Sequence, residues 1–110
     1  MEKINTEIDS MTIILHAGNA KSDSYEALLA VKAGKGKIFD EKIASAKSEI
    51  NKAHRAHAEL LRKLSSADRM EDVDLLLVHA EGHLSATNIA VDLISEFGEL
   101  FKWKESITNG

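Results

Sequence analysis

Two histidines four residues apart, His79 and His83, are the side chains of this 110-residue chain best placed to do chemistry. Positions i and i+4 lie on one face of an α-helix, so the two imidazoles are expected to be neighbours. Both fall on a seam of mainly apolar residues that recur at steps of three and four, a seven-residue period. That seam consists of Leu76, His79, His83, Ala86, Ala90, Leu93, Phe97 and Leu100.

An imidazole in such a seam can be a hydrogen-bonded interior group, a metal ligand or a nucleophile, and the pattern alone does not choose. Histidines at this spacing can bind zinc, but Glu81 stands one place later than the acid in the H-E-x-x-H motif of metalloproteases, which disfavours a zinc enzyme. A neutral imidazole has a ring nitrogen lone pair that can attack a phosphoryl group. His79 could carry phosphate in this way, while His83 either supports it or bonds within the bundle.

The other histidines have simpler interpretations. His57 lies on the seam of the preceding helix, so core packing is expected for it, and His54 stands close by. His16 is most simply structural. No nucleotide-binding loop is present, because Gly34 and Gly36 are not followed by a G-K-[ST] pattern.

Composition narrows the class of protein. The formal net charge of −4 argues against nucleic acid as the main partner, since phosphate binding needs a basic patch. The absence of cysteine excludes disulfides and thiolate metal sites and suits a reducing compartment. No apolar stretch is long enough to span a bilayer, and the acidic start is unlike a signal peptide. We therefore expect a cytoplasmic protein.

The periodicity predicts an all-α fold, an antiparallel three-helix bundle that forms a single domain over residues 1–110. The first helical stretch has an apolar stripe of Ile4, Ile8, Met11 and Leu15, which is interrupted at Gly18-Asn19. Gly18 can mark a kink, a break or a close-packing contact, and the sequence does not decide among them. Gly34-Lys35-Gly36 reads as a helix end and turn.

The second helix is expected from Ile38 to Leu64, with a strict three-four seam, and residues 65–72 read as a loop. The seam consists of Phe39, Ile43, Ala46, Ile50, Ala53, His57, Leu60 and Leu64. The third helix is expected from Val73 to Lys104, capped by Asp72 or Asp74. Residues 105–110 are expected to form a frayed tail.

The third helix is apolar on more than one face. A second stripe runs beside the histidine seam and consists of Leu77, Ala80, Leu84, Val91, Ile94 and Phe101. Two neighbouring helices can cover only part of such a helix, so the pattern predicts an oligomer in which the third helices meet.

Three motifs together resemble one family, the enzyme IIA component of the lactose/cellobiose (N,N'-diacetylchitobiose) family of the bacterial sugar phosphotransferase system. The family pattern A-G-D/N-A-R/K-S appears here as residues 17–22, Ala-Gly-Asn-Ala-Lys-Ser. The alanine-histidine pair late in the second helix appears as residues 53–54. The H-[AG]-Q-D-H-L-M motif appears as residues 79–85, His-Ala-Glu-Gly-His-Leu-Ser.

The resemblance implies a homotrimer of three-helix protomers that acts as a phosphotransferase component. His79 would accept phosphate from the phosphocarrier protein HPr and pass it to a cysteine of the cognate IIB component, with His83 as a supporting residue. Uptake of a lactose- or cellobiose-type sugar would follow, with the membrane involved only indirectly through the IIC transporter. No cofactor is implied.

The chain departs from the family motif at three places. Gly82 replaces the aspartate that gathers a divalent metal at the trimer axis, so no metal site is expected; Glu81 replaces glutamine, and Ser85 replaces methionine. These departures leave open a catalytically degenerate member or a helical interaction module without phosphotransfer. A histidine phosphotransfer domain of a signalling relay is disfavoured, because Gly82 stands where its H-x-x-K-G pattern needs lysine.

Overall fold

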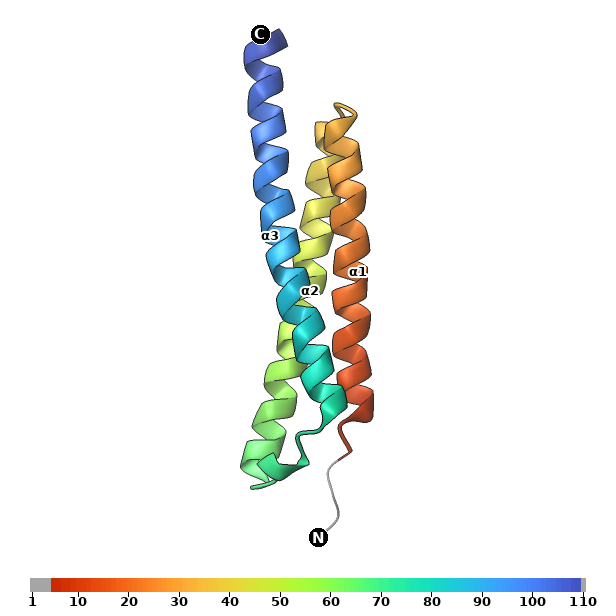
Figure 1. Cartoon of the computed structure of the whole chain (residues 1–110), viewed down its shortest axis with the longest axis vertical. Coiled ribbons are helices and arrows are strands. Elements are labelled where there is room, and N and C mark those ends of the chain that lie inside the picture. Colours follow the sequence, from red (N-terminus) through yellow and green to blue (C-terminus); the bar gives the residue numbers. More distant parts are fainter. Residues whose placement is uncertain (1–4, 110) are drawn as a thin grey trace.

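The computed structural model describes residues 5–109, which form three long helices and one short 3₁₀ turn. α1 spans Glu7–Lys32, α2 Gly36–Ser66 and α3 Leu75–Asn109, and the 3₁₀ turn η1 spans Met70–Asp72. The helices lie side by side with successive helices antiparallel, so that α1 and α3 run in the same direction (Figure 1). The bundle is 66 × 18 × 16 Å, and the end of α3 projects beyond the α1–α2 turn. The predicted all-α, antiparallel three-helix fold is confirmed.

The turn between α1 and α2 is made by a left-handed residue at the end of α1. Gly34 has φ +79°, and its N–H donates to the carbonyl of Val31 at 3.0 Å. The N–H of Lys35 reaches back to the carbonyl of Ala30 at 2.9 Å. These two bonds satisfy carbonyls that the helix end leaves without partners. Asp68, with φ 55°, adopts the same conformation after α2.

Asp74 caps α3, one of the two candidates that the sequence offered. Its Oδ1 accepts the N–H of Leu77 at 3.0 Å, and its Oδ2 accepts the hydroxyl of Thr6 at 2.8 Å. The same carboxylate therefore ties the start of α1 to the start of α3. The other candidate, Asp72, is buried and accepts a hydrogen bond from Arg69 Nε at 3.0 Å.

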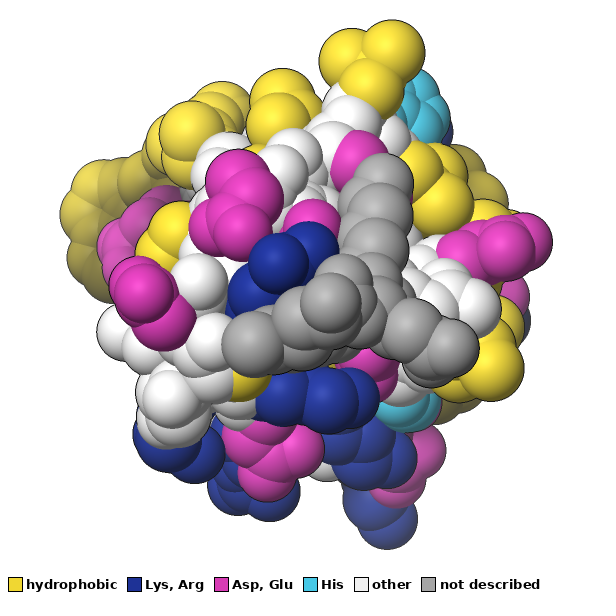
Figure 2. All heavy atoms as spheres, turned by 90° about the horizontal axis from the view of Figure 1, so that it is seen from below, with side chains coloured by type: hydrophobic (Ala, Val, Ile, Leu, Met, Phe, Trp, Pro, Cys, Tyr) yellow, Lys and Arg dark blue, Asp and Glu magenta, His cyan; other side chains and the backbone are white. Residues whose placement is uncertain are grey.

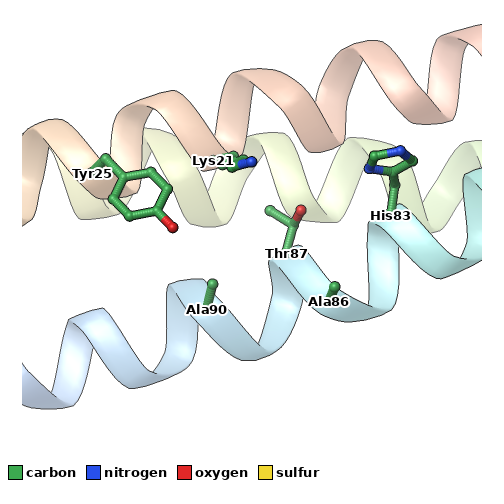
Figure 3. A pocket seen from close by; sticks show the side chains of 6 residues that line it. All are labelled: Lys21, Tyr25, His83, Ala86, Thr87 and Ala90. Carbon is green, nitrogen blue, oxygen red and sulfur yellow. The ribbon is translucent and has the colours of Figure 1, made fainter.

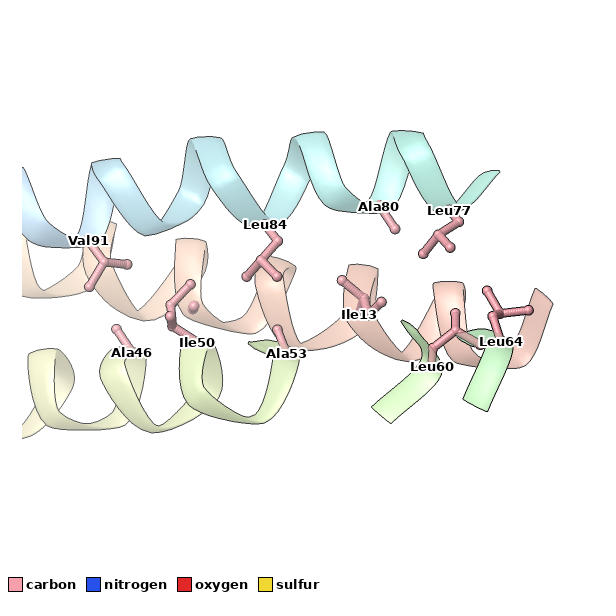
Figure 4. Packing of buried hydrophobic residues seen from close by; sticks show 11 residues of the cluster. Ile13, Ala46, Ile50, Ala53, Leu60, Leu64, Leu77, Ala80, Leu84 and Val91 are labelled. Carbon is pink, nitrogen blue, oxygen red and sulfur yellow. The ribbon is translucent and has the colours of Figure 1, made fainter. Parts of the chain in front are cut away.

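The core contains the predicted seam of α2, every member of which is buried except His57. Figure 4 shows the part of this seam from Ala46 to Leu64 packed against side chains of α1 and α3. α1 contributes mainly small residues to the interior, which lets its backbone approach the other helices closely. The buried residues of α1 are Ser10, Ile13, Ala17, Ala20, Ser24, Ala27, Ala30 and Val31.

One close contact fixes the packing of α2 against α3 near the α1–α2 turn. The ring of Phe39, 1% exposed, occupies the space that Gly98 leaves by having no side chain. A Cβ atom built on Gly98 would lie 1.9 Å from Phe39 Cζ, far inside van der Waals contact. A side chain at position 98 would therefore have to displace this buried ring.

Several predicted boundaries are corrected by the structure. α1 runs without a break through Gly18, which is exposed and has no atom within 4 Å of a Cβ built on it, so it is neither a break nor a packing contact. α3 begins at Leu75 and continues to Asn109, so the tail expected from residue 105 is helical as far as residue 109. Ile4 and Gly110 lie outside the described residues.

The two apolar stripes of α3 differ in burial. The second stripe is buried except at Phe101, whereas the histidine seam is largely exposed, with Leu93 53% and Phe97 51% accessible. The predicted stripe of α1 also faces outward: Ile8 is 76% and Leu15 59% exposed. In the end-on view of Figure 2, hydrophobic side chains lie along the upper, left and right edges, while Lys and Arg gather at the lower edge. The protomer therefore presents an uncovered apolar surface on α1 and α3.

Within residues 5–109, no helix is long and apolar enough to cross a membrane.

Candidate functional site

His79 and His83 contact each other on the exposed side of α3. Their Nε2 atoms are 3.1 Å apart, and the rings stand nearly perpendicular, at 88°, with centroids 4.5 Å apart. One Nε2–H must donate and the other nitrogen must accept, so the rings hold different tautomers when both are neutral. With His83 as donor, the accepting lone pair is that of His79 Nε2, directed at His83 on the exposed side of α3. The arrangement suits a nucleophile with an adjacent hydrogen-bond donor.

The surface above this pair is open. A shallow hollow is lined by His79, Gly82, His83 and Ala86, all from α3. No atom lies within 4 Å of a Cβ built on Gly82, so nothing in the protomer covers this turn of the helix. Both histidines are exposed, and a partner molecule can reach them directly.

A second hollow begins at His83 and runs along the groove between α1 and α3. Its volume is about 230 Å³. Lys21 and Tyr25 of α1 face His83 and Thr87 of α3 across it, and two alanines of α3 complete the wall (Figure 3). Because His83 and Ala86 line both hollows, the two spaces adjoin one another.

The histidines of α2 turn to the opposite side of α3. His57 Nε2 lies 2.5 Å from Glu81 Oε2, and this pair joins α2 to the turn of α3 that follows His79. The side chain of His57 is 22% exposed, so the expected core packing is replaced by a half-buried hydrogen bond at the rim of the core. His54 Nε2 donates to Asn88 Oδ1 at 3.0 Å, outside the core.

His16, expected to be structural, bonds α1 to α2. Its Nδ1 lies 2.5 Å from Glu49 Oε2. This hydrogen bond lowers the pKa of the Glu49 carboxyl below its usual value. Partial burial raises the pKa but is outweighed, and the charge of nearby Lys52 lowers it further. Neither His16 nor Glu49 lines the hollows beside His79 and His83.

Sequence reasoning did not identify Lys21 and Tyr25 as site residues. They lie on a different helix from the histidines, and only the packing of α1 against α3 brings them together. The available signal was the motif at residues 17–22, which contains Lys21. Among residues 5–109, no three histidine, aspartate or glutamate side chains converge closely enough within one protomer to hold a metal ion.

Comparison with known proteins places this geometry in one family. The family model described as "PTS system, Lactose/Cellobiose specific IIA subunit" matches residues 9–102. The oligo-beta-mannoside-specific EIIA component of Bacillus subtilis is 39% identical over 95 residues, which cover 86% of each chain.

Two solved structures share the fold over nearly the whole chain. The cellobiose-specific enzyme IIA of Bacillus anthracis superposes with a TM-score of 0.84 at 33% identity, covering 96% of this chain and 95% of its own. The chitobiose IIA of Escherichia coli, solved in complex with HPr, has a TM-score of 0.81 at 29% identity and covers 93% and 98% of the two chains. With a family model matched across residues 9–102 and the same three-helix fold, the chain belongs to the lactose/cellobiose-specific IIA subunits of the phosphotransferase system.

Proposed function

We propose that this protein is a phosphoryl carrier that accepts phosphate on His79 from HPr and passes it to a cognate IIB component. The observation that carries the proposal is the exposed His79–His83 contact, 3.1 Å between Nε2 atoms, on the helix that bears the family's histidine motif. The structure of an E. coli relative in complex with HPr supports the choice of donor. The sugar taken up would be of the lactose or cellobiose type, and a cytoplasmic location is part of the same proposal.

The transfer needs a nucleophile, a leaving atom and a stabilised phosphoryl group. The lone pair of a His79 ring nitrogen forms the new N–P bond, while the bond from phosphorus to the donor atom breaks and leaves its electron pair on the donor. An Nε2–H of His83, already within hydrogen-bond distance of His79, then donates to a phosphoryl oxygen. The reverse sequence delivers the group to the IIB acceptor.

We also propose that three copies associate through α3. The exposed histidine seam and the outward stripe of α1 leave more apolar surface uncovered than isolated protomers usually tolerate. α3 also continues past the α1–α2 turn with Trp103 59% and Ile107 63% exposed, where no other helix of the protomer accompanies it. His79 and His83 belong to this exposed seam, so each site would open at a boundary between protomers.

The experiment that tests phosphotransfer is incubation with phosphoenolpyruvate, enzyme I and HPr, followed by intact-mass measurement. The wild-type protein should gain one phosphoryl group, which is stable to base and lost in acid. His79→Ala should abolish the gain without changing helicity, and His83→Ala should slow it. His54→Ala, which alters an exposed histidine on α2, serves as the matched control and should be labelled at the wild-type rate. Equal labelling of His79→Ala and wild type would instead favour an interaction module that performs no transfer through this residue.

A further inference from the structure

We propose that Lys21 is the cation that stabilises the phosphoryl group carried on His79, held by the groove between α1 and α3. This inference rests on the proposed function and assigns a role to a residue of a different helix from the histidine pair. Lys21 is the one cationic side chain among the described residues that line the two adjoining hollows.

Lys21 lines the hollow that adjoins the one above His79. His83 lines both, and its Nε2 lies 3.1 Å from that of His79, so a group bonded to His79 projects beside His83. Lys21 faces the same groove from α1, next to Tyr25 (Figure 3). A lysine has a flexible four-carbon stem, so its exposed ammonium can swing along the groove toward His83.

Lys21 has no counter-ion in the part of the chain that the structure describes, residues 5–109. Its ammonium makes none of the ion pairs or side-chain hydrogen bonds of the bundle, in contrast to Lys42, which pairs with Glu26 at 2.6 Å, and Lys102, which pairs with Asp40 at 2.9 Å. An unpaired ammonium beside an open groove is available to an anion that arrives there.

The carboxylates near the groove are turned away from it. Asp23, two residues after Lys21, accepts a hydrogen bond from Ser45 of α2 at 2.6 Å. Glu81, two residues after His79, is bound to His57 of α2. Neither hollow has an aspartate or glutamate in its wall. Lys21 is therefore the one lysine, arginine, aspartate or glutamate among the described residues that line these hollows, although the whole chain has a formal net charge of −4.

A phosphoryl group brings about two negative charges near pH 7, and a lysine within a few ångströms stabilises it relative to the free histidine. Lys21 therefore favours the phosphorylated state of His79, and its removal shifts the equilibrium of transfer back toward the donor. Tyr25 and Thr87 line the same hollow with hydroxyl groups, and Lys21 contributes its one ammonium.

The test is the equilibrium between limiting phospho-HPr and this protein, read as the labelled fraction of each by intact mass. Lys21→Gln should lower the ratio of phosphorylated to unphosphorylated protein about fivefold to tenfold. Lys21→Arg keeps the charge, so its ratio should stay within about twofold of the wild-type ratio. Lys47→Gln removes one charge from an exposed lysine of α2 that makes no ion pair among the described residues, and should also stay within about twofold. A higher salt concentration should reduce the difference between the phosphorylation ratios of Lys21→Gln and wild type, because salt screens the charge of Lys21.

Two outcomes separate this inference from the proposed function. If HPr labels all variants and Lys21→Gln matches Lys47→Gln, Lys21 has no role and the phosphocarrier assignment stands. If HPr labels none of them, the assignment fails, and phosphoramidate, a chemical donor that needs no partner protein, still compares the variants. Hydrolysis of the resulting phosphohistidine should be faster in Lys21→Gln than in wild type and Lys47→Gln; equal half-lives overturn the role of Lys21.

Discussion

Replacing Gly98 with alanine should destabilise the bundle, although alanine is ordinarily the better helix former. The added Cβ would lie 1.9, 2.1 and 2.7 Å from three ring atoms of Phe39, whereas carbon atoms in contact are about 3.5–4.0 Å apart. The ring is 1% exposed and packs against the side chains of the second core cluster, which include Val31, Ile43 and Ile94. It therefore cannot yield without disturbing them.

The size of the effect follows from two opposed contributions. Alanine gains about 1 kcal/mol over glycine in a helix interior. Overpacking a close-packed core costs about 1–3 kcal/mol, and the upper end applies where the neighbour is a rigid buried ring. The net loss should be about 2 kcal/mol, which in a domain of this size lowers the melting temperature by roughly 8–16 °C.

Gly18 supplies the matched control. It lies inside α1, is exposed and has no atom within 4 Å of a built Cβ, so Gly18→Ala should stabilise by about 0.5–1 kcal/mol. The two variants make the same chemical change and should move stability in opposite directions.

The assay is urea unfolding followed by circular dichroism at 222 nm, with all variants at one protein concentration because association would contribute to stability. Phe39→Leu should remove most of the clash with an alanine at position 98. The double variant Gly98→Ala/Phe39→Leu should therefore be about 1 kcal/mol more stable than the sum of the two single changes predicts. If Gly98→Ala is as stable as wild type while Gly18→Ala behaves as expected, the close contact between α2 and α3 is wrong.

Three further predictions concern a cap, a titrating group and the assembly. Asp74→Ala should cost about 1–2 kcal/mol, because it removes the acceptor for the Leu77 N–H; urea unfolding measures the loss, and an unchanged midpoint would contradict the capping role. The hydrogen bond from His16 lowers the pKa of Glu49 in the folded state. The bond therefore stabilises the fold fully above the unfolded-state pKa near 4.5, and this stabilisation is lost as the pH falls through the lower pKa of the folded state. In Glu49→Gln, the free energy of unfolding should accordingly decrease less steeply below pH 5 than in the wild type. An acid-unfolding curve of wild-type shape would contradict this role of the His16–Glu49 bond. Leu93→Lys, at a 53% exposed position of α3, should reduce the mass measured by light scattering to that of a monomer, and an unchanged oligomer would place the contact elsewhere.

Much of the fold can be predicted from local sequence signals. The period of α2 predicted its buried face residue by residue, because a long amphipathic helix has one apolar side and the core must cover it. Gly34 marked the end of α1, since it alone tolerates the left-handed conformation there without cost. The order and spacing of the three motifs indicated the family, which the comparison confirmed.

The boundaries of α1 and α3 were predicted less well. Gly18 suggested an interruption, but a single glycine only weakens a helix, and the packing of Ala17 and Ala20 on either side holds α1 straight. The polar residues after Lys104 suggested a tail, yet the backbone hydrogen bonds of α3 continue through them to Asn109.

The sequence by itself determined that α3 has two apolar stripes and that His79 and His83 share a face. Only the tertiary structure decided which stripe is buried, because periodicity orders residues around one helix and contains no information on which side the neighbouring helices occupy. The same holds for Lys21 and His83, which line one hollow from 62 positions apart in the chain, and for the hydrogen bond between His57 and Glu81, which are 24 positions apart. Such contacts depend on how three helices pack around a shared core, and no local pattern in the sequence encodes that arrangement.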